Sequence, residues 1–288
     1  MEKQIQFHAS LLIRRSSLEL GRHRIKVMKK FLLVALLLYA TGALAQKVKL
    51  YSAGRVAYEC NVEQLDSIVF NKEDIPDVGV EHEWVDLGLP SGTLWATCNV
   101  GASSPEEYGD YFAWGETEPK DEYNWNTYKW MNAGQSSWEQ INKYTFADGQ
   151  TDACWYDGNG NFIGDNKKEF VPEDDAATAN WGSGWQMPSF DQVNELTNGN
   201  YTMTEWTTQN GVNGKKVTSV INGNSIFLPA AGYRDFRDLN GLDGGYWLRS
   251  LTPYSDHVYF LNISLGIFDT SADYRYFGRS VRPVRVKN

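Results

Sequence analysis

The sequence predicts an α+β protein with a small antiparallel sheet, about two helices and long loops, preceded by a short β-rich N-terminal segment. After residue 84, short aromatic and β-branched runs alternate with Gly, Asn and Asp turns, as is typical of antiparallel strands. A complete helix start and stop signal is found only between Ser189 and Gly199. All 11 tryptophans lie between Trp84 and Trp247, which places the main domain in that region.

The first 45 residues are expected to be absent from the mature protein. From Met28, "MKKFLLVALLLYATGALA" combines a dibasic head, an apolar run, and small residues Ala43 and Ala45 spaced for a signal peptidase. The run is about half the roughly 20 residues that a membrane span needs, which disfavours a retained anchor. We therefore predict a signal peptide over residues 28–45 and a mis-assigned extension over residues 1–27. The product is expected in the periplasm, at the cell surface or outside the cell, with no membrane span after cleavage.

The charge limits the class of partner. The first 45 residues carry eight Lys or Arg and two Asp or Glu, a net of +6, so residues 46–288 carry −15 within the whole-chain −9. Such an acidic protein repels phosphate backbones. No basic patch offsets this, because the late arginines are spread along strand-like sequence. We expect no nucleic-acid partner. A glycan or a surface protein remains open as partner, and so does the oligomeric state.

Composition divides the mature chain into two unequal parts. Residues 46–70 are predicted to form two or three strands with a turn at residues 52–54, a segment too small to bury a core alone. The acidic stretch 71–83 contains one Pro and is predicted to be a linker. Residues 84–288 then form the main domain.

Three cysteines follow the leader: Cys60, Cys98 and Cys154. An exported chain can join two of them, and the predicted disulfide is Cys98 to Cys154, since both lie in the main domain.

Local signals predict individual elements of the main domain. Ser189 is a predicted helix N-cap with Gln192 as its capping-box partner, and a second helix is predicted over residues 136–144. Asn222-Gly223 predicts a hairpin. Further strands are predicted over residues 245–250, 257–264 and 275–286, with these side chains expected in the core: Tyr246, Leu248, Val258 and Phe260.

Four stretches carry a resemblance to a known family. Residues 85–117 ("VDLGLPSGTLWATCNVGASSPEEYGDYFAWGET"), 174–189 ("DDAATANWGSGWQMPS"), 227–235 ("FLPAAGYRD") and 277–284 ("FGRSVRPV") resemble the Fibrobacter succinogenes major paralogous domain family of exported Bacteroidetes proteins. That family is similar to C-type-lectin-like domains. The resemblance implies such a fold for residues 84–288, with binding in the long loops, and it implies no particular activity.

The resembling region departs from the family at one strand. Where relatives commonly have a Tyr-Trp-Ser-Ser run, this chain has "YWLRS", so that Leu248 and Arg249 replace small residues. A binding surface at this strand is therefore expected to differ from that of the family.

Calcium is the metal that the lectin resemblance would imply. C-type lectins proper hold it with a Glu-Pro-Asn or Gln-Pro-Asp loop and a later Trp-Asn-Asp. Here the triplets read "EPK" at residues 118–120 and "WNT" at residues 125–127, and Lys120 places a cation where an oxygen ligand is needed. The loop that starts at Asp157 likewise lacks the Gly and Glu of an EF-hand.

Only one acidic cluster remains as a weak metal candidate, formed by Glu173, Asp174 and Asp175. A helix cap or a salt bridge is the favoured interpretation of these carboxylates, and a cation is the alternative. We predict no cofactor, with calcium left open.

No catalytic motif is found, and the protein is predicted not to be an enzyme. The sequence contains no G-x-S-x-G, H-E-x-x-H or Walker loop. A glycosidase needs only two suitably spaced carboxylates, so an unrecognised glycan hydrolase stays open as an alternative.

Aromatic residues between polar ones are the best candidates for ligand contact. Tryptophans in the family-like stretches are expected to anchor the core, whereas residues 122–138 are expected to expose some rings. The loop between the strands at 245–250 and 257–264 is also free to recognise a ligand. The predicted ligand-binding residues are Trp125, Tyr128, Trp130, Trp138, Arg249, Tyr254 and His257.

Together these features predict an exported, non-catalytic binding or adhesion module that recognises a glycan or a protein at the cell surface. A structural surface component that assembles through the strands of residues 46–70 is the alternative.

Overall fold

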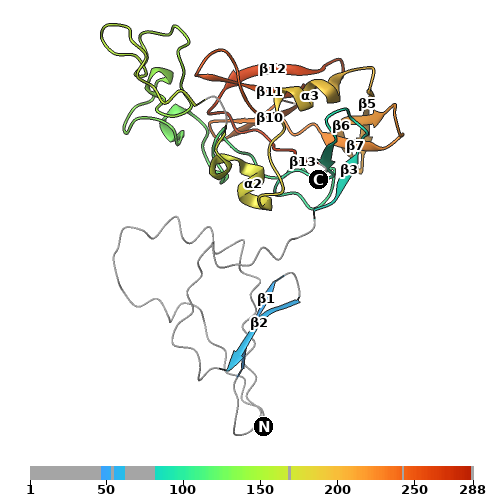
Figure 1. Cartoon of the computed structure of the whole chain (residues 1–288). Helices are drawn as coiled ribbons and strands as arrows, with labels where there is room; N and C mark the ends of the chain where they lie inside the picture. Colours follow the sequence, from blue (N-terminus) through green and yellow to red (C-terminus); the bar gives the residue numbers. More distant parts are fainter. Residues whose placement is uncertain (1–46, 53–54, 62–81, 168–169, 242, 287–288) are drawn as a thin grey trace. The chain divides into compact units, whose positions relative to one another are not determined.

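The computed structural model describes residues 47–52, 55–61, 82–167, 170–241 and 243–286. The chain divides into two compact units, residues 1–76 and 77–288, which are considered separately (Figure 1). Small antiparallel sheets dominate, with two short α-helices, which confirms the α+β class. Within the described ranges, no helix combines the length and apolarity that a membrane crossing requires.

The first unit contains one antiparallel pair, β1 (Lys47–Ser52) and β2 (Arg55–Asn61). Lys47 pairs with Asn61 and Ser52 with Arg55, and the register shifts between Leu50 and Tyr51. The predicted pair with a reversal at residues 52–54 is therefore confirmed. The remainder of the predicted segment, residues 62–70, lies outside the described residues.

In the second unit, the first and last strands of that unit belong to one sheet. Its order is β13 (Val284–Val286), β4 (Thr93–Ala96), β3 (Trp84–Asp86). Val284 pairs with Trp95, and Trp95 pairs in turn with Val85. Because Trp95 is 1% exposed, this three-stranded sheet is also part of the core.

The Asn222-Gly223 signal forms the predicted hairpin. It joins β6 (Val212–Ser219) to β7 (Ser225–Pro229), and β5 (Thr202–Gln209) completes this sheet on the other side of β6. Gly223 has φ +79, a conformation that glycine adopts without strain. The hairpin is therefore confirmed, but its loop covers residues 220–224 and Asn222 has no positive φ, so the loop is not the two-residue turn that Asn-Gly favours.

A third sheet has the order β10 (Gly244–Leu251), β11 (His257–Ile263), β12 (Phe268–Tyr274) (Figure 1). The two strands predicted here are confirmed, and the four predicted core residues are all buried: Tyr246, Leu248, Val258 and Phe260. A two-stranded sheet of β8 (Tyr233–Asp235) and β9 (Asp238–Asn240) precedes it in the chain.

The long strand predicted over residues 275–286 is wrong for most of its length, since only β13 is regular. The preceding residues pair through single bridges with three different segments, at Phe112, Arg234 and Tyr246. A segment that contacts several partners in turn cannot follow one neighbouring strand.

The described ranges contain two α-helices. The predicted one is α3 (Phe190–Thr197), and its capping box between Ser189 and Gln192 is confirmed. It lies against β10 and β12 (Figure 1). The ring of Phe190 also contacts that of Tyr259 on β11, with 4.5 Å between the ring centroids. The other, α2 (Ala176–Trp181), begins after Asp175.

The helix predicted over residues 136–144 is wrong. Only a 3-10 turn, η4 (Trp138–Gln140), forms there, and its N-cap side chain makes no capping hydrogen bond. Backbone pairing competes with the helix, because Asn142 N donates to Trp130 O and Ile141 bridges to Met131. Two more 3-10 turns occur in the loop region, η3 (Trp125–Thr127) and η5 (Pro172–Asp174).

The predicted Cys98–Cys154 disulfide is also wrong, because both are free thiols. Cys154 is held by its neighbours, and its Sγ–H donates to Ile141 O at 3.1 Å. Burial raises the pKa of the Cys154 thiol, which disfavours the reactive thiolate.

Aromatic side chains fill the loop region, which has little regular structure. Trp114, Tyr144 and Phe170 pack together, with the Trp114 and Phe170 rings stacked at 4.1 Å. Trp247, from β10, lies in the same cluster. Four of the five tryptophans expected to anchor the core are buried: Trp95, Trp114, Trp185 and Trp247.

Candidate functional site

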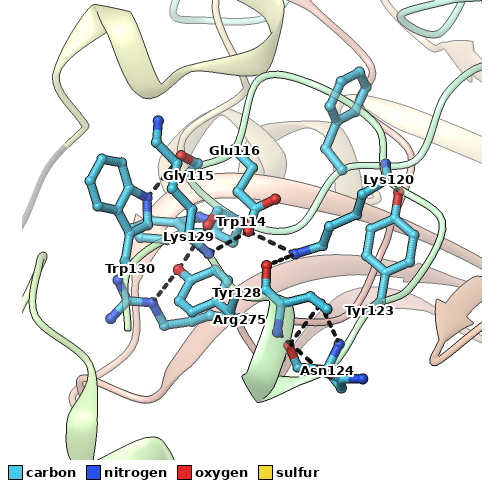
Figure 2. A network of polar contacts seen from close by, with 12 residues as sticks. Trp114, Gly115, Glu116, Lys120, Tyr123, Asn124, Tyr128, Lys129, Trp130 and Arg275 are labelled. Atoms are coloured by element: carbon cyan, nitrogen blue, oxygen red, sulfur yellow. Dashed lines mark hydrogen bonds and ion pairs between the residues drawn. The ribbon is translucent and has the colours of Figure 1, made fainter. Parts of the chain in front are cut away.

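A polar network fixes the loop that carries most of the predicted binding aromatics (Figure 2). The buried Glu116 accepts hydrogen bonds from Lys120 Nζ and from Lys129 N, both at 2.8 Å. Lys120 Nζ also donates to Thr127 O at 2.9 Å. Burial lowers the pKa of Lys120, and the Glu116 carboxylate acts against that shift. Lys120 of the "EPK" triplet therefore bonds directly to Thr127 of the "WNT" triplet, and this contact is structural.

Tyr128 lies inside this network and does not present its ring to a ligand. It is 3% exposed, and its hydroxyl donates to Trp114 O at 2.8 Å and accepts from Arg275 Nε at 3.1 Å (Figure 2). Its assignment as a ligand contact is therefore wrong. Polar residues around it suggested an exposed ring, but those residues bond to the backbone of the same loop.

Trp130 is partly exposed, and two cations already lie over its ring. The Nζ atoms of Lys129 and Lys143 lie 4.2 and 4.0 Å from the ring centroid. Both lysines also pair with the buried Asp174, Lys129 at 3.6 Å and Lys143 more closely. The indole Nε1–H donates to Gly115 O at 2.9 Å (Figure 2). This ring is thus committed to holding the loop.

The acidic cluster of residues 173–175 is built into the fold. The carboxylate of Asp174 also accepts from Tyr144 Oη at 2.5 Å. Asp175 caps α2, since its Oδ1 accepts from Ala177 N and Thr178 N, while its Oδ2 accepts from Met187 N at 2.9 Å. Glu173 is exposed. In the described part of the chain, no three His, Cys, Asp or Glu side chains are grouped so that they could hold a metal.

Trp138 packs against a small hydrophobic cluster of the loop region. Its ring centroid lies 6.0 Å from that of Trp155, and both pack around Ile141. Trp125 packs against the same cluster, so the structure brings Trp138 and Trp125 to one hydrophobic cluster.

A contiguous group of partly exposed rings gathers around Trp125. Trp125 contacts Tyr274 at 5.7 Å and Tyr276 at 4.8 Å between ring centroids. The ring centroid of Tyr274 lies 4.4 Å from that of His257, and the ring centroid of Tyr276 lies 4.4 Å from that of Phe277. We call the following six residues the ring cluster: Trp125, Tyr233, His257, Tyr274, Tyr276 and Phe277.

The tyrosines of the ring cluster differ from the buried ones in how their hydroxyls are used. The buried tyrosines Tyr111, Tyr123 and Tyr128 each donate to a backbone carbonyl. No described residue forms a hydrogen bond with the hydroxyl of Tyr233, Tyr274 or Tyr276. Because a polar group without a protein partner is normally satisfied from outside, these three hydroxyls face water or a ligand.

The carboxylates of Asp235 and Asp273 border the ring cluster. Burial raises the pKa of Asp235. The N–H of Phe236 acts against this shift, and the nearby charges of Asp273 and Asp238 add to it. Asp235 Oδ1 is buried without a hydrogen-bond partner among the described residues. Burial and these acidic neighbours raise the pKa of Tyr276 to about 12, so this hydroxyl is a donor at neutral pH.

The other predicted site residues fall in two places. Tyr254 is 55% exposed, two residues before the buried Asp256. His257 joins the ring cluster, and its Nδ1 lies 3.0 Å from Asp256 Oδ1 in a contact too poorly aligned for a hydrogen bond. Arg249 lies elsewhere and lines a cleft with Arg285.

Sequence reasoning missed Tyr233, Tyr274, Tyr276 and Phe277. The signal in the sequence was the run "YRYF" at residues 274–277, in which a tyrosine stands on each side of Arg275. In the structure Arg275 is fully buried and both tyrosines are partly exposed. Alternation of this kind places every second side chain on the same side.

Comparisons with protein-family models, with curated proteins and with solved structures find no match for this chain.

Proposed function

We propose that the protein is an exported, non-catalytic module that binds a glycan at the cell surface through the ring cluster. One observation carries the proposal: Tyr233, Tyr274 and Tyr276 belong to one contiguous set of rings, yet none of their hydroxyls is bonded to a described residue. Three unpaired hydroxyls on adjoining, partly exposed rings can donate to and accept from one ligand.

The chemistry of the cluster suits a sugar. One face of a pyranose ring presents C–H groups that pack on an aromatic ring, while its hydroxyls need donors and acceptors at the edge of the contact. The rings of Trp125 and Tyr276 supply the first, and the carboxylate of Asp235 supplies an acceptor, since its Oδ1 has no hydrogen-bond partner among the described residues. Asp273 is already paired with Arg279. Since the Asp235 carboxylate has no ion-pair partner among the described residues and disfavours an anion, the preferred sugar is neutral.

The wider features of the chain support this proposal. The leader predicts export, and the resemblance of residues 84–288 to C-type-lectin-like domains favours binding by loops. Calcium has no part in the mechanism proposed here. The ring cluster acts by stacking and hydrogen bonding, and the carboxylates of Asp174 and Asp175 are engaged by lysines and backbone N–H groups.

A glycan-array screen of purified residues 46–288, run in calcium and in chelator, tests the proposal. We expect defined neutral-glycan hits of equal strength in both conditions. A blank array in both conditions would contradict the proposal and direct the search to protein partners. Bound oligosaccharide should be recovered intact, and release of shorter sugars would favour a hydrolase instead.

A further inference from the structure

A cleft that shares no residue with the ring cluster is lined by α2, by residues 183–186 that follow it, and by Arg249 of β10 and Arg285 of β13. Its volume is about 390 Å³, within the range that small ligands occupy. The residues that matter for its chemistry are Arg249, Arg285, Trp185, Thr178, Ser183 and Gly184.

Gln186 brings the two arginines together. Arg249 Nη1 donates to Gln186 Oε1 at 2.5 Å. The backbone of Gln186 exchanges two hydrogen bonds with Val284, at 2.9 and 2.8 Å, which sets the next residue, Arg285, beside the same cleft. The Arg285 guanidinium lies 5.5 Å from the centroid of the Trp185 ring.

Neither guanidinium lies within ion-pair distance of a described carboxylate, although the Asp175 carboxylate in the same cleft attracts Arg249. Among the described residues, no carboxylate forms an ion pair with Arg249 or Arg285, and Gln186 occupies only one of the donors of Arg249. Asp175 lines the cleft, but its oxygens accept from the N–H groups of α2 and Met187. With both arginines and Asp175 ionised, the cleft carries one net positive charge.

The geometry points to a binding site for a carboxylate, and we propose that this cleft holds an acidic sugar or a similarly small organic carboxylate. Two planar guanidinium forks match the two oxygens of a carboxylate, which is the pairing that gives strong, oriented hydrogen bonds. Bringing two cations into one partly buried cleft is unfavourable unless an anion offsets their repulsion.

The charge of the whole protein narrows the ligand class further. Residues 46–288 carry a net −15, so a polyanion such as nucleic acid or a heavily sulfated chain is repelled at long range. A ligand with one negative charge meets little of that repulsion and still engages both arginines. The site does not depend on the ring cluster, because the two share no residue.

Isothermal titration of the purified protein with glucuronic acid tests this site, with glucose, inorganic phosphate and sulfate as comparison ligands. We expect glucuronic acid to bind and glucose not to bind at this cleft. Arg249→Gln and Arg285→Gln should each weaken the affinity for glucuronic acid roughly tenfold to a hundredfold. Arg249→Lys keeps the charge but loses the fork, so its affinity should lie between those of wild type and Arg249→Gln.

The matched control is Arg237→Gln, which removes one positive charge from a side chain that is 77% exposed and paired with Glu122. It should leave the affinity for glucuronic acid within twofold. Absence of glucuronic acid binding, or equal binding by the Arg249→Gln/Arg285→Gln double variant, would overturn the proposal. If phosphate or sulfate bound as tightly as glucuronic acid, the assignment of the cleft to a carboxylate would also be overturned. Thermal unfolding of each variant confirms that it is folded.

Discussion

Arg275 Nε donates a hydrogen bond to the hydroxyl of Tyr128 at 3.1 Å, and so joins the last part of the chain to a loop almost 150 positions earlier. The same guanidinium donates to the carbonyls of Ser255, Tyr144 and Lys143. Arg275 is fully buried, so its charge is solvated by these oxygens in place of water. This arginine therefore connects three loops that have little regular structure of their own.

Replacement of Arg275 by Ala is expected to destabilise the protein strongly. Arg275→Ala leaves two buried carbonyls, one partly buried carbonyl and one buried hydroxyl without their donor, which should lower the free energy of unfolding by about 3–5 kcal/mol. Urea unfolding measures this change. The exposed Arg237→Ala serves as control and should change it by no more than about 0.5 kcal/mol. A loss below about 1 kcal/mol for Arg275→Ala would contradict the role assigned to it.

Asp175 is expected to give the protein a measurable pH dependence. Burial raises the pKa of its carboxyl, and the N–H groups of Met187, Thr178 and Ala177 together with Arg249 act against that shift. With the folded pKa raised, the carboxyl contributes stability below its unfolded pKa, and that contribution is lost as pH rises through the folded pKa. Asp175→Asn keeps an acceptor for the helix cap but does not titrate.

The free energy of unfolding of wild type relative to Asp175→Asn should therefore fall as pH rises from about 3 to about 7. Urea titrations of both proteins at several pH values measure the difference. A difference that grows with pH would show that the carboxylate is favoured in the folded state.

Asp174 is expected to act as a structural ion-pair partner whether or not calcium is present. Asp174→Ala leaves Lys143, Lys129 and the Tyr144 hydroxyl without their shared acceptor, which should cost about 3–5 kcal/mol. The neighbouring, exposed Glu173→Gln is the matched control. Thermal unfolding in calcium and in chelator should give the same ranking. A calcium-dependent rise in Tm that Asp174→Ala abolishes would instead indicate a cation site.

Both main-domain cysteines should be accessible to alkylation once the protein is unfolded without reductant. The thiols of Cys98 and Cys154 are free, so each is expected to gain one alkyl group, detected by peptide mass spectrometry. A cross-linked peptide that contains both residues would contradict the structure.

Local signals in the sequence were enough to predict several elements. The Ser189 capping box, the Asn222-Gly223 hairpin and the core strands around Tyr246 depend on contacts between near neighbours, which sequence patterns report directly. The helix predicted over residues 136–144 was wrong because its backbone pairs with a segment ten residues earlier. Tertiary pairing of this kind overrides local propensity.

The site was predictable only in part, since its members come from distant segments. Trp125 and His257 were both predicted, but the structure shows that they are linked through Tyr274, which was not. Tyr128 was misassigned because a sequence does not reveal that a tyrosine hydroxyl will meet a buried arginine. Arg249 stood out through its departure from the family pattern, whereas its neighbour Arg285 in the cleft carried no such signal.

The central claim is that the ring cluster binds a glycan, and one comparison tests it most directly. The glycan array should be probed with wild type, with the Tyr274→Phe/Tyr276→Phe double variant, and with Tyr201→Phe as a matched control. Tyr201 is partly buried outside the ring cluster, and it also lacks a described hydrogen-bond partner for its hydroxyl. Loss of two ligand hydrogen bonds should weaken every neutral-glycan hit roughly fivefold to a hundredfold in the double variant, while Tyr201→Phe should bind as wild type does. Hits of equal strength in all three proteins would contradict the claim.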